Sequence, residues 1–190
     1  AAVPGVARVR SIRIVDADMK DTVPGEAGEI LVRTGNPGQF TVMRAYYNQP
    51  KATAETLVDG WLRTGDLGRL DEDGFLYLVD RLKDMIISGG LNIHSREVEA
   101  ALIKHPAVAE VAVVGVADPE FGESVMAFVQ LKAGQSVAPE QLIEHCRPYI
   151  ASYKKPKYIN FVDELPRNSS GKVMKRELRE RAAAEVAGSH

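Results

Sequence analysis

The sequence predicts an α+β protein in two parts: the remnant of a mostly β N-terminal subdomain, residues 1–80, followed by a compact two-layer α+β domain, residues 81–190. Apolar residues form 45% and charged residues 26% of the 190-residue chain, the balance of a globular protein that buries a core. Short Val- and Ile-rich runs separated by turns fill the first part, whereas strand-like and helix-like segments alternate from Asp80 onward. This change in pattern places the boundary near Asp80–Lys83.

Strands and one short helix are expected in the first part. Val6–Asp16 and Glu29–Arg33 are rich in Val and Ile, and FTVMRAYYN, residues 40–48, predicts a third strand. QPKATAETL, residues 49–57, has the composition of a short helix, with its proline suited to the first turn. Such strands form either a small barrel or a sheet attached to a larger body.

A β-hairpin is predicted at the end of the first part. Two apolar stretches in residues 59–81 flank the tetrapeptide DEDG. Its Asp73-Gly74 pair is typical of a tight hairpin turn.

The second part is expected to follow the order β, α, β, β, α, β, α. A helix over residues 95–105 carries Val98, Ala101 and Leu102 at helical spacing, and Ser95 suits its N-cap. The other predicted elements are a short strand at 85–90 that ends in a double-glycine bend, strands at 108–118, 124–134 and 157–166, a helix at 138–150 and a terminal helix from Lys175. This order is typical of a compact two-layer α+β domain.

Composition and charge argue against several classes of function. The net charge of −2 disfavours general binding to nucleic acid or to anionic membranes, which requires a basic surface. The longest apolar run, VAVVGVA, is too short to form a transmembrane segment. The single cysteine, Cys146, forms no internal disulfide and favours a cytoplasmic protein. No histidines are spaced as a ligand pair, so no metal site is predicted in this chain.

The segment RNSSGKVMKREL, residues 167–178, places Lys172 directly after a glycine in a basic stretch. A phosphate-binding P-loop would need glycine at Pro166 and a hydroxyl at Val173, so this segment is not such a loop. A nucleic-acid-binding tail would need more positive charge and interleaved aromatic residues. The basic residues of the helix that follows are interpreted as its solvated face: Lys175, Arg176 and Arg179.

Four stretches, in this order, resemble the adenylate-forming enzymes, which include acyl-CoA synthetases, peptide-synthetase adenylation domains and firefly-type luciferases. They are GEILVRTG…YYNQPKATAET, DGWLRTGDLGRLDEDGFLYLVDR, DRLKDMIISGGLNIHSREVE and LPRNSSGKVMKREL. Together they cover nearly the whole chain from Gly28 to Arg179. The stretch DRLKDMIISGG is most similar to the acyl-CoA ligase branch, so the resemblance implies the C-terminal portion of such an enzyme.

The resemblance implies that Asp66 and Arg81 bind ATP or AMP. Asp66 follows a glycine in RTGD at a predicted strand end, where a carboxylate can accept both hydroxyls of a ribose. Arg81 carries a planar guanidinium suited to ribose or phosphate oxygens. Considered alone, Asp66 would satisfy its own turn, and Arg81 would form a surface ion pair with Asp80 or Asp84.

The resemblance also assigns a hinge and a coenzyme A site. Lys83 matches the family's hinge position. Ser88, Gly89 and Gly90 match the loop that lines the tunnel for the pantetheine arm of CoA, where paired glycines admit a close ligand. Phe121, in the turn DPEFGES, matches an aromatic residue that stacks on the CoA adenine. The alternatives are a solvated lysine, an ordinary turn and an aromatic side chain packed in the core.

Lys172 matches the family's catalytic lysine, which stabilises negative charge while a carboxylate displaces pyrophosphate from the ATP α-phosphate. The resemblance thus implies an ATP-dependent acid–thiol ligase that forms acyl-AMP and transfers the acyl group to CoA through a hinge motion of its C-terminal lid. The implied substrates are a carboxylic acid, ATP and CoA, with Mg²⁺ held mainly outside this chain. The family's phosphate loop and acyl pocket are missing, so an N-terminal domain is expected before residue 1, and the isolated chain is expected to be inactive.

A hypothesis of another class stays open at this point. The chain could instead be a non-catalytic, stand-alone module that binds a nucleotide or CoA, or that completes a partner enzyme in trans. The two hypotheses differ in whether an N-terminal domain precedes Ala1.

Overall fold

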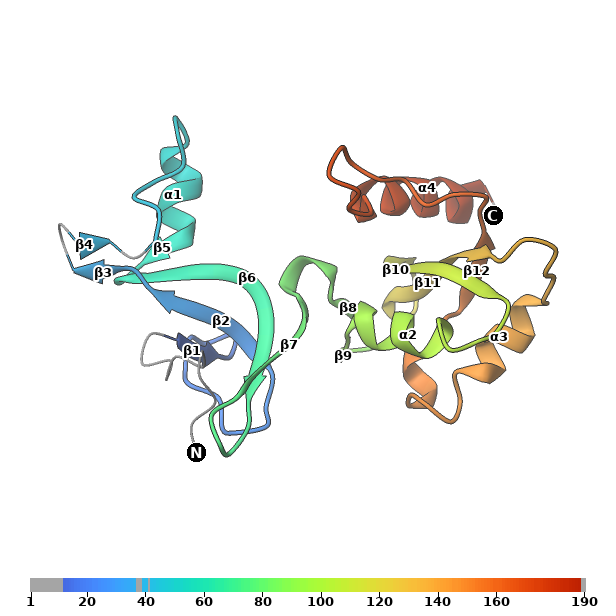
Figure 1. Ribbon diagram of the computed structural model, residues 1–190, viewed down its shortest axis with the longest axis horizontal. Coiled ribbons are helices and arrows are strands. Elements are labelled where there is room, and N and C mark those ends of the chain that lie inside the picture. The colour runs from blue at the N-terminus through green and yellow to red at the C-terminus, as the bar shows by residue number, and fades with distance from the viewer. Residues whose placement is uncertain (1–11, 37–38, 41, 189–190) are drawn as a thin grey trace. The chain divides into compact units, whose positions relative to one another are not determined.

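The computed structural model describes residues 12–36, 39–40 and 42–188. The chain forms two compact units, Ala1–Leu82 and Lys83–His190 (Figure 1). The α+β class is confirmed, because the first unit is mostly β and the second combines a sheet with helices. Within the described residues, no helix is both long enough and apolar enough to cross a membrane.

The first unit is built on one antiparallel sheet. Its strands are β1 (Ile12–Val15), β2 (Gly28–Arg33), β5 (Leu57–Val58), β6 (Trp61–Leu70) and β7 (Leu76–Arg81). β6 is central, with β2 along one edge and with β5 and β7 at the two ends of the other. β1 pairs with β2, so the described strands form an open sheet rather than a barrel. A two-stranded ribbon, β3 (Gly35–Asn36) and β4 (Gln39–Phe40), lies apart from this ladder.

Two strands predicted in the first unit differ from the structure. Residues 6–11 of the first predicted strand lie outside the described residues, and its remainder forms β1. The strand predicted over residues 40–48 is wrong, because residues 42–48 form bends and a turn and no strand. They have no buried face to place in a sheet: Tyr47 is 89% exposed, and Asn48 adopts a positive φ of 51°.

The predicted short helix and hairpin are confirmed. The helix is α1 (Pro50–Thr56), and the hairpin is formed by β6 and β7. Asp71 stabilises the hairpin turn, since its carboxylate accepts the N–H groups of Asp73 and Phe75 at 3.1 and 2.8 Å. The bond from the Phe75 N–H holds the pKa of Asp71 below its ordinary value.

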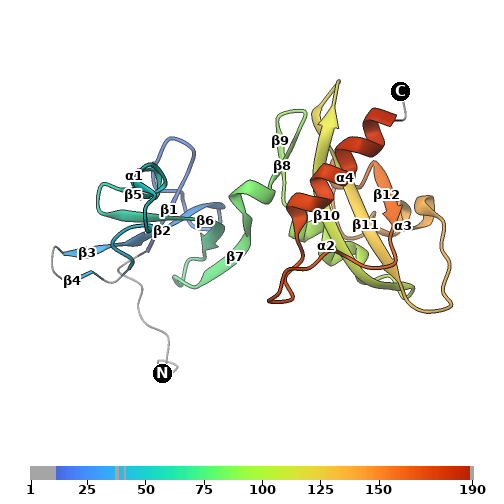
Figure 2. The same ribbon diagram turned by 90° about the horizontal axis from the view of Figure 1, so that it is seen from above.

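The second unit is built around a long hairpin. β10 (Val108–Asp118) and β11 (Gly122–Leu131) pair antiparallel, and β12 (Tyr158–Phe161) pairs parallel with β11. The hairpin of β8 (Ile86–Ser88) and β9 (Leu91–Ile93) joins the start of β11 (Figure 2). The helices are α2 (Ser95–Leu102), α3 (Pro139–His145) and α4 (Lys175–Gly188), and short 3₁₀ turns lie at Leu82–Asp84 and Ser152–Lys154.

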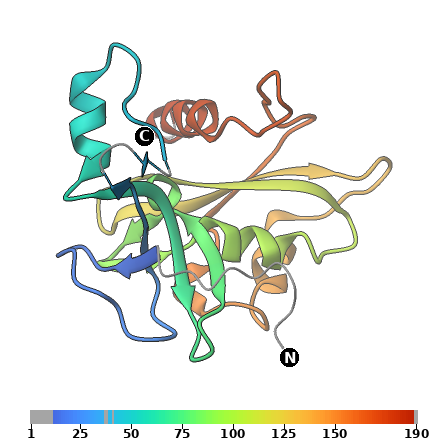
Figure 3. The same ribbon diagram turned by 60° about the vertical axis from the view of Figure 1, so that its left-hand side comes forward.

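Helices cover both faces of this sheet, with α4 on one face and α2 and α3 on the other (Figures 1 and 3). Val113 of β10 shares a buried cluster with Leu102 and Leu142 of α2 and α3. The next residue, Val114, shares another with Leu178 of α4. The domain therefore has one more layer than the two predicted, because a continuous apolar run in a strand places apolar side chains on both faces.

The segment after the first unit differs in detail from the prediction. The predicted double-glycine bend is confirmed, because Gly89 and Gly90, with φ of +56° and +78°, form the two-residue turn of the β8–β9 hairpin, but the strand β9 after this bend was not predicted. Ser95 is the first residue of α2, and His94 occupies the N-cap position, so the predicted cap is one residue off. The Ser95 hydroxyl is buried and accepts a hydrogen bond from Lys175 Nζ at 2.7 Å.

Candidate functional site

Asp66 and Arg81 are brought together in the first unit by the β6–β7 ladder. They are direct cross-strand neighbours, and Arg81 Nε donates to Asp66 Oδ1 at 2.9 Å. Gly65, with φ of +68°, and Thr64, whose hydroxyl accepts the Asp66 N–H at 3.1 Å, shape the strand just before the carboxylate. The side chains of Asp66 and Arg81 are 38% and 42% exposed, so this ion pair contributes little to stability and stays accessible to ligand oxygens.

Ser88, Gly89, Gly90 and Phe121 form one cluster in the second unit. Ser88 pairs with Gly122 of β11, and the Gly89 N–H donates to the Phe121 carbonyl at 2.8 Å. A Cβ added at Gly89 would lie 3.3 Å from Cδ1 of Phe121, so the ring lies close against the glycine backbone. The Phe121 side chain is 45% exposed, and it therefore does not pack in the core.

Asp118 holds the Phe121 turn, a role that the sequence reasoning missed. One oxygen of its buried carboxylate accepts the N–H groups of Glu120 and Phe121 at 3.0 and 3.1 Å. The other oxygen accepts from Lys157 Nζ at 2.7 Å and from the Ser124 hydroxyl. The Lys157 ammonium and the Ser124 hydroxyl hold the pKa of Asp118 well below its usual range. The only local signal for this position is the Asp-Pro pair, which is typical of a turn.

Lys83 lies in the 3₁₀ turn where the second unit begins, and its side chain is exposed. The C-terminal helix binds this turn, because Arg179 of α4 donates to the Lys83 carbonyl at 2.9 Å and to Asp84 Oδ1 at 2.6 Å. The backbone that follows Lys83 is therefore attached to the second unit.

Lys172 lies on a hydrogen-bonded turn before α4. The side-chain oxygen of Asn168 accepts the N–H groups of Ser170 and Lys172 at 3.1 and 2.9 Å, and the Asn168 N–H donates to the Lys172 carbonyl at 2.9 Å. Gly171 takes a φ of +79°, a left-handed conformation that glycine adopts at little cost. Because the Lys172 side chain is exposed, the turn presents an ammonium group to solvent from a fixed backbone.

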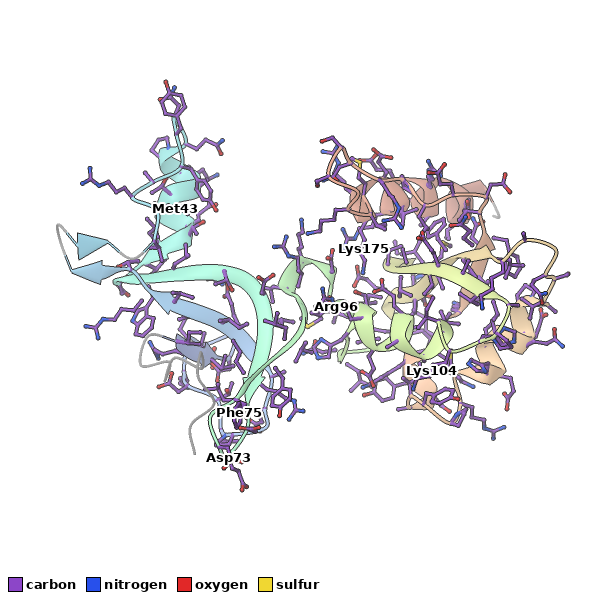
Figure 4. The ribbon with its side chains drawn as sticks, viewed as in Figure 1. Met43, Asp73, Phe75, Arg96, Lys104 and Lys175 are labelled. Atoms are coloured by element: carbon purple, nitrogen blue, oxygen red, sulfur yellow. The ribbon has the colours of Figure 1, made fainter. Side chains whose placement is uncertain are left out.

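The basic residues of α4 do not all face solvent. Lys175, labelled in Figure 4, donates to Ser95 Oγ and pairs with Glu99 Oε1, both at 2.7 Å, and its side chain is 17% exposed. Arg179 binds the 3₁₀ turn that contains Lys83, as described above. The prediction of a solvated face is therefore wrong for these two residues, because α4 packs on the sheet and turns them toward carboxylates. It is right for Arg176, whose side chain is 81% exposed.

The predicted site residues thus form separate groups, each within one unit. The Asp66–Arg81 pair offers a carboxylate and a guanidinium suited to a ribose, and Lys172 offers a cation suited to developing negative charge. The glycine turn exposes backbone that carries no Cβ beside the exposed ring of Phe121, a surface suited to a narrow ligand chain and a planar ring. Among the residues that the structure describes, no three His, Cys, Asp or Glu side chains are grouped so that they could hold a metal.

Known proteins match most of the chain. Residues 97–172 match the family model described as the AMP-binding enzyme C-terminal domain. The 2-succinylbenzoate–CoA ligase of Geobacillus sp. (strain WCH70) is 46% identical over 166 residues, which cover 87% of this chain and 33% of that ligase. The long-chain-fatty-acid–CoA ligase of Yersinia pestis is 45% identical over 169 residues, which cover 89% of this chain and 29% of that ligase.

A solved structure matches in the same way. The o-succinylbenzoate CoA synthetase of Bacillus subtilis, in complex with the acyl-adenylate intermediate OSB-AMP, superposes with a TM-score of 0.78 at 42% identity. The match covers 88% of this chain and 33% of that protein. The chain therefore spans about a third of the length of the relatives it matches.

Proposed function

We propose that the chain is the C-terminal part of an ATP-dependent acyl-CoA ligase, on the premise that residues 97–172 match the model of the AMP-binding enzyme C-terminal domain family. A carboxylic acid and ATP would form acyl-AMP and pyrophosphate, and CoA would then take the acyl group and release AMP. The matched relatives are CoA ligases for 2-succinylbenzoate and for long-chain fatty acids, which are the first acids to test. These matches favour a ligase over a non-catalytic module.

The observation that carries the proposal is the exposed ammonium of Lys172 on its hydrogen-bonded turn. In the first half-reaction a carboxylate oxygen attacks the α-phosphorus of ATP, and the bond to the pyrophosphate oxygen breaks. Negative charge then spreads over the phosphoryl oxygens, and a cation fixed beside them lowers the barrier without transferring a proton. We assign this role to Lys172.

We assign nucleotide binding to Asp66 and Arg81. The carboxylate accepts hydrogen bonds from the ribose hydroxyls, and the guanidinium both orients that carboxylate and reaches ribose or phosphate oxygens. Their 2.9 Å ion pair and their partial exposure support this role, since the pair is already oriented and still accessible.

We assign the second half-reaction to the cluster of Ser88, Gly89, Gly90 and Phe121. The CoA sulfur attacks the acyl carbonyl carbon, and the carbonyl–phosphate oxygen bond breaks as AMP leaves. The glycine turn would line the path of the pantetheine arm, while the exposed ring of Phe121 would stack on the adenine.

In this proposal residues 1–80 are the β-rich end of a large N-terminal domain, and residues 81–190 are a mobile C-terminal lid. The hinge is Lys83, at which the second compact unit begins. Rotation there would present Lys172 in the first half-reaction and the glycine turn in the second. The N-terminal domain would supply the acyl pocket and most of the groups that hold Mg²⁺, in a cytoplasmic enzyme.

The two half-reactions separate the roles of these residues. In the longer ligase, replacing Lys172 by alanine should lower acid-dependent ATP–pyrophosphate exchange by about 100-fold or more, because one charge-stabilising donor is lost. Transfer of the acyl group from preformed acyl-AMP to CoA should change little. Replacement of the exposed Arg176 by alanine is the matched control and should leave both rates unchanged.

Two results would contradict the proposal. One is ATP–pyrophosphate exchange by the Lys172→Ala enzyme within about threefold of the parent enzyme, a change too small for the loss of a charge-stabilising donor. The other is acid-dependent exchange by the 190-residue chain alone, because the proposal requires an N-terminal domain.

A further inference from the structure

The Lys172 turn is closed by its own hydrogen bonds, but these bonds do not attach it to the sheet. Asn168 accepts the N–H groups of Ser170 and Lys172, and the Gly171 N–H donates to the Asn168 carbonyl at 2.9 Å. All of these groups lie within residues 168–172, so they fix the shape of the turn. The direction in which Lys172 points depends on what the turn is tied to.

Arg167 ties the tip of the turn to the sheet. Its Nη1 donates to the carbonyl of Gly171, the residue before Lys172, at 2.6 Å. Its Nη2 donates to Glu110 Oε2, also at 2.6 Å. One planar guanidinium thus connects the turn to strand β10, and a planar fork fixes direction as well as distance.

Glu110 occupies a special position on β10. The β10–β11 register shifts between Val108 and Glu110, so a β-bulge lies just before Glu110. A bulge re-aims the side chains of its strand. β10 pairs only with β11 among the described strands, so Glu110 lies on an edge of the sheet.

The base of the turn is held by the backbone and by packing: Arg167 and Val173 form an antiparallel bridge, the Met174 N–H donates to the Pro166 carbonyl at 2.8 Å, and Val173 packs against the buried cluster that contains Leu178. These contacts hold the base of the turn, whereas the Arg167 guanidinium adds the link from its tip, at Gly171, to β10. A groove of about 330 Å³ lies beside the turn, lined by Glu99, Ala100, Ile103, Glu110, Arg167 and Val173 among others. The Arg167–Glu110 bridge spans the same region.

We propose that Arg167 and Glu110 are positioning residues, which hold the Lys172 turn against the sheet so that the ammonium points in one direction. The proposal rests on the function assigned to Lys172 above. Glu110 acts only through Arg167, and Arg167 acts through the Gly171 carbonyl. The proposal assigns neither residue a contact with substrate.

Amide hydrogen exchange in the 190-residue chain tests the positioning without any catalysis. The Arg167 and Glu110 side chains are 37% and 42% exposed, so the effect of removing the Glu110 charge is modest: in Glu110→Gln the exchange of the Lys172 and Ser170 N–H groups should rise by roughly threefold, because the turn opens locally more often. Exchange in the β10–β11 ladder, for example at Val113, should not change. Glu180→Gln, which removes an exposed carboxylate paired with Arg176 at 3.6 Å, is the matched control and should change neither region. Exchange at Lys172 within twofold of the parent chain in Glu110→Gln would overturn the proposal.

The longer ligase gives the second test. Glu110→Gln and Arg167→Ala should each lower the maximal rate of acyl-AMP formation several-fold, with little change in the KM for ATP and with CoA transfer intact. Because Glu110 acts through Arg167, the double variant should be no slower than Arg167→Ala alone. Losses that multiply in the double variant would contradict the relay.

The two proposals fail in different ways. If Lys172→Ala leaves acyl-AMP formation unchanged, the function assigned to Lys172 is wrong, whatever the exchange data show. If Lys172→Ala abolishes acyl-AMP formation while Glu110→Gln changes neither exchange nor rate, only the positioning role is wrong.

Discussion

Two turns of the second unit use the same hydrogen-bonding device in opposite surroundings. Asp118 accepts the N–H groups of Glu120 and Phe121, and Asn168 accepts those of Ser170 and Lys172. Each side chain therefore shapes the turn that presents a proposed functional residue. The difference lies in burial and in charge.

The Asp118 carboxylate is buried and is tied to the Lys157 ammonium, whereas Asn168 is exposed and neutral. Breaking the contacts of a buried carboxylate lowers the free energy of unfolding far more than breaking the hydrogen bonds of an exposed amide. The Phe121 turn should therefore contribute to the stability of the domain, whereas the Lys172 turn can change with little effect on global stability.

Replacement of Asp118 by alanine should have the largest effect on stability. It leaves the Lys157 ammonium, the Ser124 hydroxyl and the N–H groups of Glu120 and Phe121 without their shared acceptor. Thermal unfolding of the chain should show a Tm lower by several degrees. An unchanged Tm would remove the distinction between the two turns.

Lowering the pH should remove the contribution of Asp118 to the stability of the chain. Its pKa is lower in the folded chain than in the unfolded chain, because the Lys157 ammonium and the hydrogen bonds favour the charged form. As the pH falls, the unfolded chain binds the proton first, so the stabilisation is present above about pH 4 and is lost below it. The difference in Tm between the parent chain and Asp118→Asn should therefore shrink between about pH 4 and pH 2. A difference that stays constant over this range would contradict the assignment.

Replacement of Gly89 by alanine should have a smaller effect of about 1–2 kcal/mol, because a side chain at positive φ is strained and the new Cβ meets the Phe121 ring. Gly134 also has a positive φ, +73°, but a Cβ there meets nothing within 4 Å. Gly134→Ala is therefore the matched control for backbone strain alone. In the longer ligase Gly89→Ala should also raise the KM for CoA, and equal unfolding free energies for the two variants would argue against the ring contact.

Replacement of Asn168 by alanine should have the smallest effect on stability, at most about 0.5–1 kcal/mol, because the lost bonds are exposed to water. Acyl-AMP formation should nevertheless fall, since Lys172 loses the acceptor that fixes its N–H. Chemical denaturation of the chain and the first half-reaction of the ligase measure the two quantities. A loss of stability as large as that of Asp118→Ala would show that the two turns contribute equally to stability.

Much of the fold could be predicted from local patterns. The long hairpin of β10 and β11 follows from two β-rich runs around a turn, and α2 follows from apolar residues at helical spacing. The β strand predicted over residues 40–48 failed because apolar composition alone does not supply a partner strand. The continuous apolar run in β10 could also have predicted a sheet covered on both faces.

The parts of the candidate site that could not be predicted are contacts between residues far apart in the chain. Asp118 and Lys157 are 39 residues apart, and Glu110 and Arg167 are 57 residues apart. No local pattern marks such pairs, because each partner resembles an ordinary surface charge in its own segment. Resemblance to a family indicates which residues are functional, but the residues that position them can be identified only from the structure.

The measurement that tests the account most directly is acyl-AMP formation in a single turnover by the longer ligase, with Lys172→Ala and Lys172→Arg compared side by side. We predict a loss of about 100-fold or more for alanine, a partial recovery for arginine because the charge is kept, and an unchanged Tm for both. Acyl-AMP formation at the parent rate by the alanine variant would contradict the account.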